Sequence, residues 1–65
     1  MLKRIIARNK ITGDFELFCQ TESEMVWETA QSILATNAHK FSGYSYEKWD
    51  ERLQRWHAYF KYGII

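Results

Sequence analysis

The feature that most constrains how this chain can fold is a run of aromatic residues between Ser45 and Gly63. Within this run, large apolar side chains recur every three or four residues, at Tyr46, Trp49, Leu53, Trp56 and Phe60. Such a recurrence is typical of the buried stripe of an amphipathic helix. Ser45 suits an N-cap position, and Gly63 suits the C′ position that follows the end of a helix. The pattern therefore predicts one helix over about residues 46–62.

A second stripe on the same predicted helix combines cations with phenol rings. Its members, spaced in the same way, are Lys48, Arg52, Arg55, Tyr59 and Tyr62. A helix that only has to be soluble does not need aromatic rings on this side, and Tyr and Arg are enriched at the centres of protein interfaces. We therefore predict that these residues bind a partner, together with Met25, which falls outside the apolar face of a second helix predicted below over about residues 22–38.

The N-terminal part of the chain predicts a β-hairpin over about residues 2–19. Two short runs rich in Ile, Leu and Phe, residues 2–8 and 14–19, flank a segment with turn-forming residues at both ends, Asn9 to Gly13. Strict alternation in the second run places on one side Phe15, Leu17 and Cys19.

A first helix is predicted over about residues 22–38. Residues 21–24 read Thr-Glu-Ser-Glu, which is the pattern of a capping box with Thr21 as the N-cap residue. The whole chain, residues 1–65, is then one small α+β domain of order ββαα, with the N-terminal antiparallel β-hairpin packed against a two-helix hairpin. The predicted core consists of Ile5 or Ile6, Leu17, Trp27, Ile33, Leu34, Trp49, Leu53, Trp56 and Phe60.

Charge is segregated along the chain although the net charge is only +1. Residues 1–13 carry four bases and no acid, whereas residues 14–28 carry five acids and no base. The small net charge argues against a general polyanion binder, but the segregation favours separate basic and acidic patches.

Catalytic, metal and cofactor sites are not predicted. Cys19, His39 and His57 have neither the spacing of zinc ligands nor a partner at hydrogen-bonding range. Asp50 and His57 would lie two turns apart on the predicted helix, about 10.5 Å along its axis. Glycine-rich phosphate loops are also lacking, so we expect no enzyme.

The surplus of exposed aromatic and Arg residues favours a protein–protein interaction domain, acting as an adaptor or inhibitor. A lone cysteine suits the cytoplasm, and the lack of a long apolar run argues against a membrane span. A short chain that begins at Met1 without a linker also suits a viral or mobile-element accessory protein. A core this small leaves a homodimer open. The alternative function is single-stranded nucleic-acid or RNA binding by a basic, aromatic surface.

Overall fold

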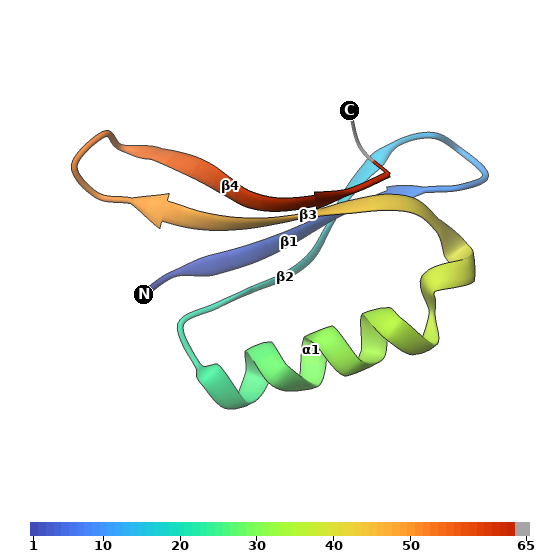
Figure 1. Cartoon of the computed structure of the whole chain (residues 1–65), viewed down its shortest axis with the longest axis horizontal. Coiled ribbons are helices and arrows are strands. Elements are labelled where there is room, and N and C mark those ends of the chain that lie inside the picture. The colour runs from blue at the N-terminus through green and yellow to red at the C-terminus, as the bar shows by residue number, and fades with distance from the viewer. Residues whose placement is uncertain (64–65) are drawn as a thin grey trace.

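The computed structural model describes residues 1–63 and contains one four-stranded antiparallel sheet with a single α-helix on one of its faces (Figure 1). In chain order the elements are β1 (Lys3–Asn9), β2 (Phe15–Thr21), α1 (Glu24–Thr36), the 3₁₀ helix η1 (Ala38–Lys40), β3 (Phe41–Asp50) and β4 (Arg55–Tyr62). The strands lie side by side in the order β2-β1-β3-β4. The face that α1 packs on is called the helix side below, and the opposite face is called the open face.

The predicted second helix is wrong, because residues 46–62 belong to the antiparallel hairpin β3–β4. Trp49 pairs directly with Trp56 across a four-residue turn over residues 51–54. Asp50 starts this turn, since its Oδ1 accepts hydrogen bonds from the backbone N–H groups of Arg52 and Leu53 at 2.9 and 3.1 Å. The domain is therefore ββαββ rather than ββαα.

The predicted N-terminal hairpin is present as β1 and β2. Its turn is closed by the Asn9 side chain, whose Oδ1 accepts from the N–H groups of Ile11 and Thr12 at 2.8 and 3.0 Å, and Gly13 supplies a positive φ of 77°.

A bulge in β2 overturns the predicted alternation of that strand. Cys19 pairs with Ile5 and Leu17 with Ile6, so that Phe18 is an extra residue without a partner in the ladder. Phe18 and Cys19 therefore both pack against the core under α1, whereas Phe15 and Leu17 lie on the open face.

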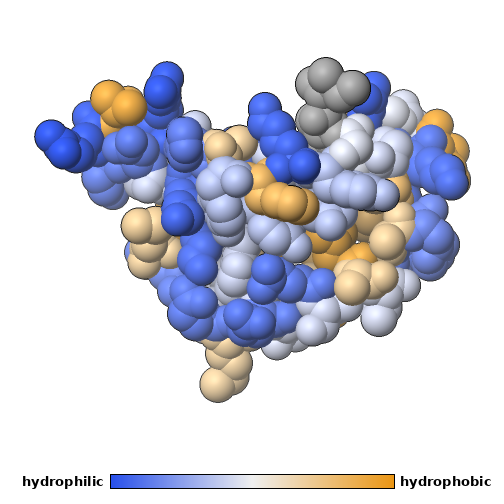
Figure 2. All heavy atoms as spheres, viewed as in Figure 1, coloured by the Kyte–Doolittle hydropathy of each residue, from blue (hydrophilic) through white to orange (hydrophobic). Residues whose placement is uncertain are grey.

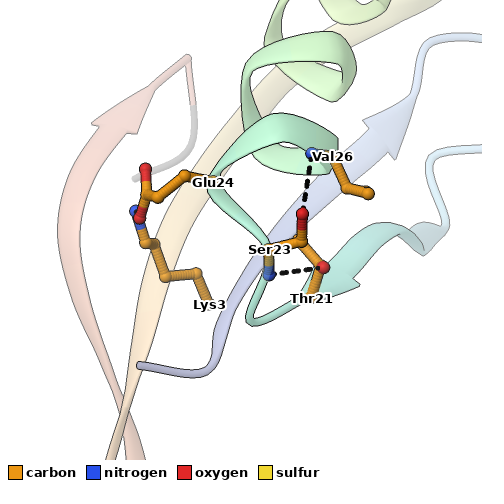
Figure 3. Close-up of polar contacts among 5 residues, drawn as sticks. All are labelled: Lys3, Thr21, Ser23, Glu24 and Val26. Atoms are coloured by element: carbon orange, nitrogen blue, oxygen red, sulfur yellow. Dashed lines mark hydrogen bonds and ion pairs between the residues drawn. The ribbon is translucent and has the colours of Figure 1, made fainter.

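The predicted first helix is present, but it begins later than predicted. Thr21 is the last residue of β2, and the N-cap residue is Ser23, whose Oγ accepts from the N–H of Val26 at 3.3 Å (Figure 3). Thr21 instead accepts a hydrogen bond from the N–H of Ser23 at 3.0 Å and so holds the turn that enters the helix. The observed N-cap residue therefore lies two residues after the predicted one.

Replacing Ser23 by Ala should lower the free energy of unfolding by about 1 kcal/mol, because a first-turn N–H loses its acceptor. Urea denaturation followed by circular dichroism measures this change, with Ser32→Ala on the exposed side of α1 as the control. Equal stabilities for the two variants would contradict the assignment of Ser23 as the N-cap.

The apolar core is small and lies between α1 and the three strands β1, β2 and β3. Its buried apolar side chains are Ile5, Ala7, Trp27, Ala30 and Leu34. Partly buried residues extend it at Phe18, Cys19, Phe41, Tyr44 and Tyr46. Several residues predicted in the core are instead about half exposed, namely Leu17, Ile33, Leu53 and Phe60. Trp49 and Trp56 are only partly buried, because they lie on the open face, which no helix of residues 1–63 covers.

Candidate functional site

The helix side of β3 and β4 carries a cluster of aromatic side chains that α1 leaves accessible. We call this cluster the tyrosine surface, and its members are Tyr44, Tyr46, Tyr59, Phe60 and Tyr62. In the view of Figure 2, the tip of the β3–β4 hairpin is mostly hydrophilic.

A second bulge, in β4, brings two consecutive aromatic residues to the same side of the sheet. Phe60 pairs with Tyr46 and Ala58 pairs with Glu47, so Tyr59 is the extra residue. A bulge places the two residues near the extra position on one face. The Tyr59 ring consequently lies 6.2 Å from the Tyr46 ring, and the Phe60 ring lies 5.4 Å from it.

The rings of the tyrosine surface contact one another across the two strands. Tyr44 and Tyr62 are stacked with ring centroids 5.3 Å apart, and Tyr44 and Tyr46 are 5.4 Å apart. Trp27 of α1 packs edge-on against Tyr46 at 5.5 Å. Such pairs contribute about 0.5–1.5 kcal/mol each beyond area burial. The tyrosine surface is thus held in place by the core, although its outer rings face solvent.

Few charges accompany these rings. The Lys48 ammonium lies 4.7 Å from the centre of the Tyr59 ring, and the neighbouring Lys3 ammonium is neutralised by Glu24 at 2.8 Å (Figure 3). Burial raises the pKa of the Tyr59 phenol, with Lys3 acting in the opposite direction. The pKa of Tyr44 is raised as well, first by burial and then by its phenol neighbours. Both hydroxyls stay protonated at neutral pH and can donate hydrogen bonds.

The structure brings together only part of the predicted partner-binding set. Lys48, Tyr59 and Tyr62 lie on the helix side of the hairpin. Lys48 lies over the Tyr59 ring, and Tyr62 stacks on Tyr44. Arg55 is at the start of β4, opposite Asp50, and Arg52 is in the turn, so neither belongs to the cluster.

Met25, the remaining predicted residue, is 80% exposed in the first turn of α1. Sequence reasoning missed three members of the tyrosine surface, Tyr44, Tyr46 and Phe60, because the helical pattern either omitted them or assigned them to the core. The sequence signal for them is an aromatic residue at every second position, at Tyr44 and Tyr46 and again at Phe60 and Tyr62, which is the period of a strand.

A hollow of about 480 Å³ lies at the end of the sheet where the chain begins. It is lined by Met1, Leu2, Glu22, Lys48, Trp49, Asp50, Glu51 and His57. Its charges are of both signs, and the Asp50 carboxylate is already engaged in closing the turn. Within residues 1–63, no group of three His, Cys, Asp or Glu side chains could hold a metal ion.

No protein family, curated protein or solved structure matches this chain. In the described part of the chain, no helix is long and apolar enough to cross a membrane. What the protein does must therefore be inferred from the chemistry of its own surfaces.

Proposed function

We propose that this domain is a non-enzymatic protein-binding module, an adaptor or inhibitor, whose partner docks on the tyrosine surface. The observation that carries the proposal is the exposure of three adjacent aromatic rings: Tyr59 is 42% exposed, Phe60 45% and Tyr62 61%. Clustered aromatic side chains at the surface of a small domain are typical of binding sites, and tyrosine is enriched among the residues that dominate binding energy.

The chemistry of the tyrosine surface suits a protein better than a polyanion. In the part of the chain that the structure describes, the cation over its rings is Lys48, and the ion pair of Lys3 with Glu24 beside it adds no net charge. Burying the rings gains about 25 cal/mol per Å² of apolar area. The protonated hydroxyls can meanwhile donate to backbone carbonyls of the partner.

Both outer strands of the sheet carry a bulge, β2 at Phe18 and β4 at Tyr59. Bulges on edge strands disfavour strand-by-strand pairing with another chain. A second copy of this chain would therefore associate through the tyrosine surface rather than through a sheet edge. We also place the protein in the cytoplasm, where a free thiol such as that of Cys19 persists.

Replacing Tyr59 and Tyr62 together by Ser should weaken partner binding at least about tenfold, or about 1.4 kcal/mol, because the partner loses desolvated aromatic contacts. The measurement is quantitative pull-down from a cognate lysate treated with nuclease, followed by titration of the purified partner. Binding should change little with salt.

The matched control is Phe15→Ser, which removes an aromatic ring of comparable exposure from the open face. This variant should keep the partner. Retention of the partner by the Tyr59/Tyr62 variant, with its fold intact, would contradict the proposal.

A further inference from the structure

The open face of the sheet combines cations with aromatic rings and, within residues 1–63, holds a single side-chain carboxylate. By strand pairing, its cations are Arg4 and Arg8 of β1 and Lys61 of β4, and its acid is Glu47 of β3. Its larger apolar side chains are Ile6, Phe15, Leu17, Trp49 and Trp56. None of these residues takes part in the tyrosine surface, which lies on the other side of the sheet.

The single acid of the open face is already engaged. Glu47 accepts from the Nε of Arg4 at 2.6 Å and from the hydroxyl of Ser45 at 3.3 Å. Arg8 and Lys61 form no ion pair with any carboxylate of residues 1–63. The face therefore presents two positive charges without a compensating anion from this part of the chain.

The opposite layer of the molecule is acidic. Helix α1 contains Glu28 and Glu24, of which Glu24 is paired with Lys3, and no Lys, Arg or His, and Glu22 precedes it. An anionic ligand is consequently attracted to the open face and repelled by the helix layer, although the net charge of the chain is only +1. This polarity favours an anionic ligand on the open face.

Aromatic rings lie directly beside the arginines of the open face. The Arg8 guanidinium is 5.5 Å from the centre of the Phe15 ring, which is 57% exposed, and the Arg4 guanidinium is 4.2 Å from the Trp56 ring. Trp49 packs edge-on against Trp56 at 5.4 Å. Paired rings and guanidinium planes are the groups on which unpaired bases stack.

The shape of the open face suits a flexible strand. Figure 1 shows that the tips of both hairpins bend away from α1, and Figure 2 shows the outline indented on that side next to the tip of the β3–β4 hairpin. A sheet face that combines cations with stacking rings can hold phosphates and bases of a single strand at once. Neither the acidic side chains of a peptide nor a stacked duplex would use the rings in this way.

We propose that the open face binds single-stranded nucleic acid, with Arg8 and Lys61 contacting phosphates and Phe15 stacking on a base. This binding is independent of the tyrosine surface, so a protein partner and a nucleic-acid strand can occupy the domain together. Recognition depends on backbone charge and stacking, and we expect little dependence on base sequence.

The test titrates the full chain with oligo-dT and oligo-U of about 15 nucleotides, using tryptophan fluorescence. A duplex of the same length and a polyglutamate peptide are the comparison ligands. Two phosphate contacts predict a salt slope of about −1.4, so a fourfold rise in salt should weaken binding of the single strand about sevenfold. The duplex and the polyglutamate peptide should bind at least about tenfold more weakly than the single strand.

Charge reversal at Arg8→Glu and Lys61→Glu together should weaken single-strand binding at least about tenfold. The matched control, Arg52→Glu with Arg55→Glu, makes the same change in net charge on residues outside the open face and should alter affinity less than about threefold. Phe15→Ala should weaken binding about fivefold or more, through the lost stacking. Circular dichroism checks the fold of each variant. If charge reversal unfolds the chain, the Arg8→Ala, Lys61→Ala double variant replaces it in the same titration.

Three results would overturn the proposal. The first is the absence of single-strand binding by the folded chain at low salt. The second is equal affinity for polyglutamate, which would assign the face to an acidic protein segment. The third is equal loss of affinity in the Arg52/Arg55 control, which would indicate attraction by net charge alone. In each case partner binding through the tyrosine surface would remain a separate proposal, because the Tyr59→Ser, Tyr62→Ser variant tests it alone.

Discussion

Truncation of Trp27 to Ala should leave the domain largely unfolded. Its indole is only 4% exposed, packs against Tyr46 and lies 5.0 Å beneath the Lys3 ammonium. Removing a buried aromatic side chain costs about 3–5 kcal/mol. A domain of this size has a total stability of roughly 5 kcal/mol, so little would remain. Chemical denaturation followed by circular dichroism measures the loss directly.

Trp56→Ala is the matched control for this substitution. Trp56 is predicted from sequence to lie in the core, but it is partly exposed on the open face beneath the Arg4 guanidinium. Its truncation should cost about half as much as that of Trp27, since less of the ring leaves an apolar environment. A Trp56 variant that is less stable than the Trp27 variant would contradict the position of the core.

Replacing Ile5 by Ala should destabilise the domain by about 2–5 kcal/mol. Ile5 is completely buried between the sheet and α1, and the sheet has no room to collapse into the resulting cavity without disturbing the helix. The change in the midpoint of urea denaturation, at constant slope, measures the effect.

Ile6→Ala provides the control within the same strand. Ile6 is the next residue, points to the open face beside Leu17, and is only partly buried. The sequence left open which of the two isoleucines faces the core. A larger loss for Ile6 than for Ile5 would mean that α1 packs on the other face of the sheet.

The first hairpin and the helix could be predicted because their signals are local. A turn with Asn9 and Gly13 at its ends closes β1–β2 through side-chain and backbone geometry that neighbouring residues supply. The start of α1 was mistaken by two residues, because Thr21 and Ser23 can each accept a capping bond. Thr21 pairs with Lys3 of β1 and therefore belongs to β2, so the N-cap position falls to Ser23.

The second hairpin could not be distinguished from a helix by periodicity. A four-residue turn places Trp49 opposite Trp56, seven residues later, and this separation is also two helical turns. The bulge at Tyr59 then shifts the alternation of β4 by one residue and removes its period of two. The remaining signal was composition, because aromatic residues favour strands, and it was weaker than the apparent helical stripe.

The candidate site was predicted in part and for the wrong structural reason. Lys48 lies over the Tyr59 ring, and Tyr62 stacks on Tyr44, because β3 and β4 pair and not because these residues share a helix face. Arg52 and Arg55 drop out because the turn and the first residue of β4 separate them from the rings. Bulges depend on pairing with another strand, so the grouping of Tyr59 with Phe60 required the structure.

Site-specific photo-crosslinking tests directly whether a protein partner docks on the tyrosine surface. A benzophenone amino acid replaces either Tyr62, on this surface, or Ser32, on the exposed side of α1. In cells that carry the protein, irradiation should yield one discrete protein adduct from position 62 and none from position 32. An adduct from position 32 alone, with both variants folded, would place the partner on the helix and contradict docking on the tyrosine surface.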